Sequence, residues 1–303
     1  MICHLRSGGS NAVRSRGRVH AEGVKLRRVH AVLSAGFDNP ALIARWRAEP
    51  DLLRDHGIEP SQVDLDAMWR FAALTVKLLH NGLRDEFPAS FRLMAVAGLE
   101  VELFASYASD RAARRVKLAP TLEGRTLDLL VFLEGWLDRS DHAQALLWDL
   151  IRHERALTRL GRTALAVGSS ADLRIAGAPI QPGTDVVPRV RGEVALHEVS
   201  CDPRALAAAL QAPGPGPGDD EPDLAAVPRE PAYLCYWRAD TGPEIAILQL
   251  DELAFSTLSL VDGRRTAAEL YRALGGGRRP TSAFLQLLGE LQTLGIVALR
   301  RPR

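Results

Sequence analysis

The chain has few cysteines and no long apolar run. Its 303 residues include only three cysteines, which are widely spaced and form no CxxC pair. This odd, scattered set excludes a disulfide framework and a cysteine-based zinc site. No apolar run approaches the roughly 18 residues that a membrane-spanning helix needs, and the first residues have no apolar core of the kind found in secretory signals. We therefore expect a cytoplasmic protein with no membrane partner.

An excess of charge of one sign is also lacking. Lysine and arginine total 38, aspartate and glutamate total 37, and the net charge is +1. This balance gives no electrostatic reason to expect a nucleic acid or a membrane surface as partner of the whole chain. Charged residues make up 25% and hydrophobic residues 47% of the sequence, which is typical of a globular protein.

The motifs of common catalytic and cofactor-binding sites are missing as well. There is no phosphate loop, no GxGxxG after a strand and no GxSxG elbow. The adjacent pair His153-Glu154 is followed by Leu157 at the position where a zinc protease helix has its second histidine. Asp149 and His153 are four residues apart on one helix face, so half of a metal site and an ordinary hydrogen bond remain alternatives. We expect no catalytic residue, metal site or cofactor in this chain.

The N-terminal half reads as helical. Residues 1–24 are basic and without periodicity, which predicts a disordered tail. Residues 25–162 show helical periodicity with short connections, which predicts a bundle of five or six helices. Ser61 with Asp64 three residues on is typical of a capped helix start. A long helix is expected from Pro88 through Tyr107, and a helix buried on most sides over Leu127–Leu137.

Composition then divides the rest of the chain. Residues 163–211 mix β-branched residues with glycine and proline, which predicts extended pieces and one or two strands. Residues 212–231 contain alternating proline and glycine followed by acids, which is typical of a linker. We place a domain boundary there, so that residues 232–303 form a separate, tethered module.

This C-terminal module shows two strands followed by three short helices. The strands are expected at Tyr233–Trp237 and Ile245–Leu250. Strands and helices in this order and size predict a small winged-helix-like domain. The expected fold class is thus α+β, with an all-helical bundle followed by the winged-helix-like domain.

The last helix of the module, residues 281–294, has no lysine or arginine. Reading bases in the major groove takes Arg, Lys, Asn or Gln on the inserted helix, and cations for the phosphates. Only Gln286 and Gln292 are suitable donors. A DNA-binding transcriptional regulator with a helical sensor domain therefore remains the alternative rather than the first hypothesis.

The same helix is unusually apolar. Phe284, Leu285 and Leu288 belong to an apolar arc wider than one buried stripe requires. Either these residues fill a small core, or part of the arc lines a groove beside the strand pair. A sheet edge next to such a groove suits a peptide that adds as a further strand. The candidate peptide-binding residues are Glu244, Ile245, Ala246, Ile247, Leu248, Phe284, Leu285 and Leu288.

Two pairs of segments resemble a known family. FPASFRLM (Phe87–Met94) and WDLIRHERAL (Trp148–Leu157) are similar to the helical part of partner subunits of multinuclear non-haem iron oxidative enzymes. Those enzymes act in the biosynthesis of ribosomally made, post-translationally modified peptides, methanobactin among them. PAYLCYWR (Pro231–Arg238) and the segment Leu250–Leu270 resemble the leader-recognition module of such partners.

The resemblance implies a non-catalytic subunit. Its helical domain would dock on the iron enzyme, and its C-terminal module would hold the leader of a precursor peptide. The iron would belong to the partner enzyme, and this chain would carry no cofactor. The residues we expect at the partner interface are Asp149, Arg152, His153 and Glu154.

Overall fold

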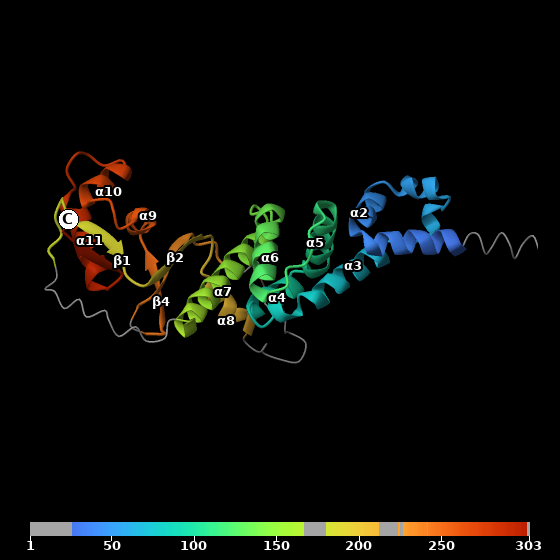
Figure 1. Cartoon of the computed structure of the whole chain (residues 1–303), viewed down its shortest axis with the longest axis horizontal. Coiled ribbons are helices and arrows are strands. Elements are labelled where there is room, and N and C mark those ends of the chain that lie inside the picture. The colour runs from blue at the N-terminus through green and yellow to red at the C-terminus, as the bar shows by residue number, and fades with distance from the viewer. Residues whose placement is uncertain (1–25, 167–179, 212–223, 225–226, 241, 302–303) are drawn as a thin grey trace, which may run out of the picture. The chain divides into compact units, whose positions relative to one another are not determined.

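A computed structural model describes residues 26–166, 180–211, 224, 227–240 and 242–301 (Figure 1). The predicted tail and most of the predicted linker lie outside these residues. The chain consists of two compact units, each built from two segments of the sequence. Unit 1 comprises Met1–Arg84 and Gly98–Gly135, and unit 2 comprises Asp85–Ala97 and Trp136–Arg303. The coarse prediction of a helical N-terminal region and C-terminal strands and helices is confirmed.

Unit 1 is helical throughout the part that the structure describes. It begins with a helix over residues 26–38, inside the region predicted to be helical. Four further α-helices and three short 3-10 helices make up the rest of the described part of the unit. Their bounds are α2 (Pro40–Ala48), 3-10 helices Pro50–His56, Pro60–Gln62 and Asn81–Leu83, α3 (Leu65–Leu79), α5 (Glu100–Arg114) and α6 (Leu122–Trp136).

Three predictions for the helices need correction. The α3 helix is capped by Asp64, whose side chain accepts from the backbone N–H of Ala67, and Ser61 lies in a separate 3-10 turn. The long helix expected from Pro88 is two helices, because Gly98 has a φ of +66° and ends the first of them. On α6 only one face is buried, since Leu127 and Val131 are 49% and 65% exposed.

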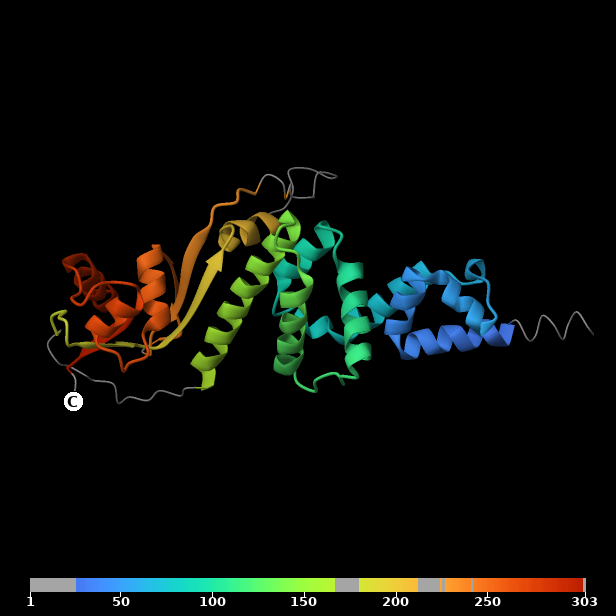
Figure 2. The same cartoon turned by 90° about the horizontal axis from the view of Figure 1, so that it is seen from above.

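Unit 2 combines helices with two small sheets (Figures 1 and 2). Its helices are α4 (Pro88–Val96), α7 (His142–Ala166), α8 (Pro203–Gln211), α9 (Glu252–Leu260), α10 (Ala267–Ala273) and α11 (Ser282–Thr293). Its strands are β1 (Val187–Val190), β2 (Glu193–Val199), β3 (Ala232–Arg238), β4 (Ile245–Leu250) and β5 (Val297–Arg300). Strands β2, β3 and β4 form an antiparallel sheet in that order, and β1 pairs with β5.

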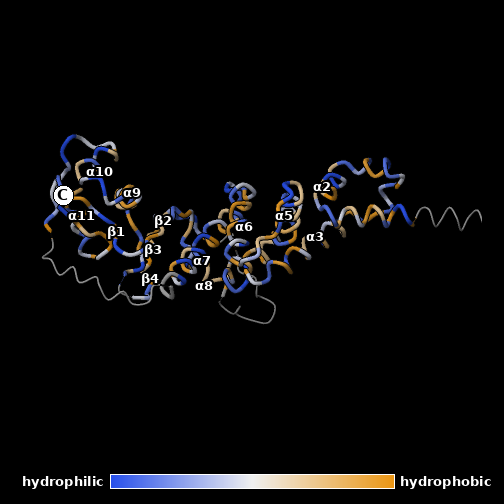
Figure 3. Tube along the Cα trace, viewed as in Figure 1, coloured by the Kyte–Doolittle hydropathy of each residue, from blue (hydrophilic) through white to orange (hydrophobic). Residues whose placement is uncertain are grey.

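Both faces of the three-stranded sheet carry apolar side chains, which belong to two separate clusters, and Figure 3 shows hydrophobic residues along the trace of the strands. Side chains alternate between the faces of a strand. One face packs on the α9–α11 core through residues such as Cys235 and Leu248. The other packs on α7 through residues such as Tyr236 and Ile247. Figure 2 shows the strands running between α7 and the C-terminal helices. The sheet is therefore the middle layer of unit 2.

This sheet overturns the predicted domain boundary. Strand β2 precedes residues 212–231 and β3 follows them, yet the two strands pair along their whole length, from Glu193 opposite Arg238 to Val199 opposite Ala232. Residues on both sides of the predicted linker thus belong to one compact unit. The predicted module at 232–303 lacks β1 and β2, and it is not a separately tethered body.

Local signals within the C-terminal helices are confirmed. Thr266 and Glu269 form a capping box at the start of α10, with each side chain bonded to the other residue's backbone N–H. Thr281 caps α11 by accepting from the N–H of Phe284. No helix among the described residues is both long enough and apolar enough to cross a membrane.

Candidate functional site

All four residues predicted at a partner interface make internal contacts, and three of them are buried. Asp149, His153 and Glu154 of α7 are 4%, 6% and 8% exposed. Asp149 accepts from the backbone N–H and the hydroxyl of Ser200, both at 2.6 Å. Burial raises the pKa of Asp149 and of Glu154. These side chains hold parts of unit 2 together, and only Arg152 of the predicted set is partly accessible.

Glu154 anchors helix α4. Its two carboxylate oxygens accept from the backbone N–H groups of Ala89 and Ser90, each at 2.9 Å, and from the Ser90 hydroxyl at 2.6 Å. These amides lie in the first turn of α4, where the helix itself supplies no acceptor. A carboxylate there also complements the positive end of the helix dipole. The resemblance-derived segments around Phe87 and Trp148 are therefore joined through this contact.

His153 connects α7 to the sheet. Its Nδ1 lies 2.8 Å from the hydroxyl of Tyr236 on β3, and the ring of His197 on β2 lies 5.1 Å from the same tyrosine ring. Burial lowers the pKa of His153, and burial with nearby positive charge lowers that of His197 to about 3. The hypothetical metal pair of Asp149 and His153 is thus engaged by Ser200 and Tyr236. Within the described residues no group of three or more His, Cys, Asp or Glu side chains could hold a metal ion.

The outer edge of β2 is covered by arginine side chains of α7. Arg152 donates to the carbonyl of Glu198 at 3.1 Å, and Arg159 donates to the carbonyl of Val194 at 3.5 Å. In an antiparallel strand, backbone groups of alternate residues point to opposite sides. Val194 and Glu198 are an even number of residues apart, so both arginines bond carbonyls on the same side of β2, which we infer is the side that faces away from β3.

The outer edge of β4 has a different environment. This strand pairs only with β3, from Ile245 opposite Arg238 to Leu250 opposite Tyr233. Among the described residues no backbone hydrogen bond reaches its other side. Of the predicted peptide-binding residues, Glu244 is exposed, and Ile245, Ala246, Ile247 and Leu248 are half-buried. The structure thus brings these five together along one open sheet edge.

The predicted residues of α11 are not at that edge. Phe284 and Leu288 are completely buried in the core of α9–α11, and Leu285 is half-buried against it. The two alternatives for this helix are therefore decided for Phe284 and Leu288, which fill the core and line no groove. Their depth could not be predicted from periodicity, because it depends on distant residues of the same core, such as Val186 and those of β5.

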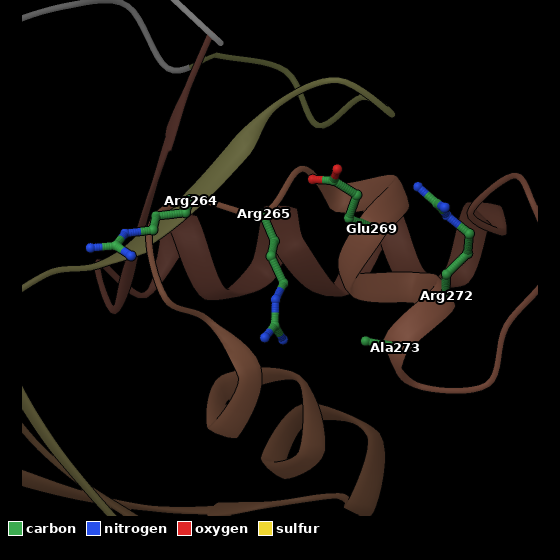
Figure 4. Close-up of a pocket in the computed structure, with 5 residues that line it drawn as sticks. All are labelled: Arg264, Arg265, Glu269, Arg272 and Ala273. Atoms are coloured by element: carbon green, nitrogen blue, oxygen red, sulfur yellow. The ribbon is translucent and has the colours of Figure 1, made fainter.

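Unit 2 has a basic hollow whose charged groups do not point towards one position. It has a volume of about 460 Å³ and is lined by Arg264, Arg265, Glu269, Arg272 and Ala273. Figure 4 shows the three guanidinium groups pointing in different directions. Glu269 is already held by Thr266 in the α10 capping box. This hollow does not offer several donors to one small ligand.

Comparison with known proteins adds no assignment. No protein-family model matches the chain, and no curated protein matches it.

Proposed function

We propose that this chain is a non-catalytic partner subunit that binds an extended peptide at the outer edge of β4 and presents it to an iron-dependent oxidative enzyme. The observation that carries the proposal is the contrast in backbone hydrogen bonding across one sheet. The β2 edge is occupied by Arg152 and Arg159, whereas the described residues leave the β4 edge open. An open edge is a template for a further strand.

The register defines which backbone groups a peptide would use. Outward bonds at Val194 and Glu198 imply that residues 193, 195, 197 and 199 face β3. Following the pairs across β3, residues 246, 248 and 250 of β4 then exchange bonds with β3. Ile245, Ile247 and Gln249 are left to offer their N–H and C=O groups to a peptide.

The side chains along β4 favour an apolar peptide partner. Ile245 and Ile247 pack on the α7 side of the sheet, and Leu248 and Leu250 pack on the α9–α11 side. All four are half-buried and none is charged. An added strand would extend both apolar faces, so alternate apolar side chains of the peptide would gain contacts on each face.

The finer identity of the C-terminal region belongs to the same proposal. Strands β2, β3 and β4 followed by α9, α10 and α11 fit a winged-helix-like, leader-recognition fold in which the peptide is the leader of a precursor. Holding the leader raises the effective concentration of the modifiable segment at the partner's active site. The partner would be a multinuclear non-haem iron enzyme that supplies the metal and the oxidation, and this chain would supply no cofactor.

A proline scan of β4 tests the peptide site. Gln249→Pro removes an N–H that points away from β3, so the ladder to β3 should survive. We expect peptides selected from a displayed random library by the wild-type chain to bind this variant at least about tenfold more weakly, because one or two backbone bonds are lost. Calorimetric titration measures the affinity.

The adjacent position is the matched control. Leu248→Pro removes a bond to β3 and should unfold the sheet, as circular dichroism would show. If Gln249→Pro folds and binds the selected peptides as tightly as the wild type, the β4 edge is not the peptide site. Co-expression with an iron enzyme and a short open reading frame encoded beside this chain tests the partnership. The partnership is contradicted if the chain does not co-purify with the enzyme and does not change the modification of the peptide.

The arginines that line the basic hollow beside α10 support one alternative function. This hollow exposes Arg264, Arg265 and Arg272. A DNA-binding regulator would need exposed cations of this kind to contact the phosphates. Helix α11, however, carries no cation. A mobility shift with duplex DNA at low salt separates the two functions, and we expect no shifted band.

A further inference from the structure

A pocket of unit 2 lies where α7 meets the end of β2. Its volume is about 440 Å³, and its polar and aromatic lining consists of Arg139, Trp148, Asp149, Arg152, Glu198 and Ser200. No residue of the proposed peptide edge at β4 lines this pocket. It includes Arg152, the one predicted interface residue that is partly accessible. The pocket is named the Trp148 pocket below.

Two guanidinium groups share one aromatic ring in the Trp148 pocket. The central carbon of Arg139 lies 4.7 Å from the centre of the Trp148 ring, and that of Arg152 lies 5.5 Å from it. Both distances are within the range of cation–π attraction. Such contacts hold the cationic heads over an aromatic surface while their N–H groups remain available at the rim. The two heads are thus positioned before any ligand arrives.

Few of their donors are used. Each guanidinium carries five N–H groups. Arg152 donates one hydrogen bond, to the carbonyl of Glu198, and the described residues give the Arg139 side chain no hydrogen bond or ion pair. Burial lowers the pKa of Arg152, the neighbouring Asp149 carboxylate raises it, and the like charge of Arg139, which repels that of Arg152, lowers it further. An anion between them would use the donors and relieve this repulsion.

The acids of the pocket limit how much charge a ligand can carry. Asp149 is engaged by the Ser200 hydroxyl and amide, so it is not free to pair with the arginines. Glu198 is exposed and also lines the pocket. Two carboxylates beside two guanidinium groups disfavour a doubly charged anion by like-charge repulsion. A single carboxylate matches the planar donor pairs of arginine and adds only one negative charge.

The remaining walls are apolar. Ala145, Val199 and Pro231 complete the lining beside the Trp148 ring. They would contact the methylene stem that carries such a carboxylate. We infer that the Trp148 pocket is a carboxylate-binding site, which receives a glutamate-like group with its stem on the apolar wall and its oxygens on Arg139 and Arg152. This inference does not depend on peptide addition at β4.

Isothermal titration of the full-length chain tests the site. The probes are an unstructured glutamate-rich peptide and free butyrate, which distinguish a carboxylate on a polypeptide from a small monocarboxylic acid. Arg139→Met and Arg152→Met keep an apolar stem near Trp148 but remove the donors. We expect each substitution to weaken carboxylate binding about tenfold, because each removes a charge-assisted pair. Arg278→Met, at an exposed loop position, should change it less than about twofold.

The outcomes decide both the site and the source of the carboxylate. Binding of the peptide alone assigns a polypeptide ligand, and comparable binding of butyrate assigns a free acid. The inference is overturned if neither probe binds, if Arg278→Met weakens binding as much as the pocket variants, or if inorganic phosphate binds more tightly than both. Thermal unfolding confirms that each variant is folded. Gln249→Pro should leave carboxylate binding unchanged, so failure here and failure of the β4 proposal are separable.

Discussion

The two edges of the three-stranded sheet differ in how their backbone groups are satisfied. At the β2 edge, Arg152 and Arg159 of α7 donate to strand carbonyls. At the β4 edge, the described residues supply no such donor. The composition of the two strands follows the same division, since β2 carries Glu193, His197 and Glu198 and β4 carries no charge. Charged side chains on an edge strand oppose further pairing, so one edge is blocked and the other is left available.

The largest effect is expected from a charge placed in the core beneath both edges. Leu288→Asp puts a carboxylate at a completely buried position of α11. A buried, unpaired charge is among the few changes that cost more than about 4 kcal/mol of stability. We expect the C-terminal half of unit 2 to unfold, with both edges lost together. Chemical denaturation followed by circular dichroism measures the loss.

Leu294→Asp is the matched control for this substitution. Leu294 follows α11 and is 52% exposed, so the same charge there should change the free energy of unfolding by less than about 0.5 kcal/mol. Equal stability of the Leu288 and Leu294 variants would mean that α11 does not pack as described, and would reopen the groove interpretation of this helix.

Acid should weaken the α7–sheet contact behind the β2 edge. Burial and nearby positive charge lower the pKa of His197 to about 3 from an ordinary value of 6.5, so the native state binds fewer protons than the unfolded state between these values. This contribution to stability is present above pH 6.5 and is lost as the pH falls towards 3, at up to about 1.4 kcal/mol per pH unit. Asp149 and Glu154, whose pKa values are raised, act in the opposite sense.

Comparison with His197→Phe isolates the histidine. The Nδ1 atom of His197 is buried without a hydrogen-bond partner among the described residues, so a phenyl ring should be tolerated at neutral pH. We expect the difference in unfolding free energy between wild type and variant to change steadily between pH 6.5 and pH 4.5. A difference that does not change with pH would show that His197 titrates normally.

Removing the arginine cover should make the β2 edge resemble the β4 edge. The double variant Arg152→Ala, Arg159→Ala removes two donors to strand carbonyls. We expect a loss of about 1–2 kcal/mol in stability and stronger self-association, measured by sedimentation velocity over a range of concentrations. The double variant of Arg278 and Arg279, on an exposed loop, is the control. Unchanged association would indicate that other groups block this edge.

Features set by neighbouring residues could be predicted from the sequence. The strand Ile245–Leu250 and the capping box of Thr266 and Glu269 match the structure, because turn residues and caps act within a few positions. The pairing of β2 with β3 could not be predicted in this way. Its partners lie on either side of a proline- and glycine-rich segment whose composition is typical of a linker, and only the alternation in Glu193–Val199 signals a strand.

For the candidate site too, features set by neighbouring residues could be predicted and features set by distant residues could not. The strand β4 could be predicted, because an uncharged strand followed by helices is recognisable from neighbouring residues. The depth of Phe284 and Leu288 depends on elements distant in the sequence, and so does the burial of Asp149, His153 and Glu154. A polar side chain on a helix predicts an exposed face unless its partner is known. The partners Ser200, Tyr236 and Ser90 come from separate elements.

The smallest change in stability is expected from giving β4 the kind of protection that β2 has. Gln249 is exposed, and its backbone is expected to face away from β3. Gln249→Lys should therefore alter the free energy of unfolding by less than about 0.5 kcal/mol, while the charge opposes pairing with another strand. Gln286→Lys places the same charge on the exposed side of α11 and controls for net charge. If only the Gln249 variant loses peptide affinity, the open edge of β4 is where the peptide binds; if both variants lose it equally, net charge is the cause.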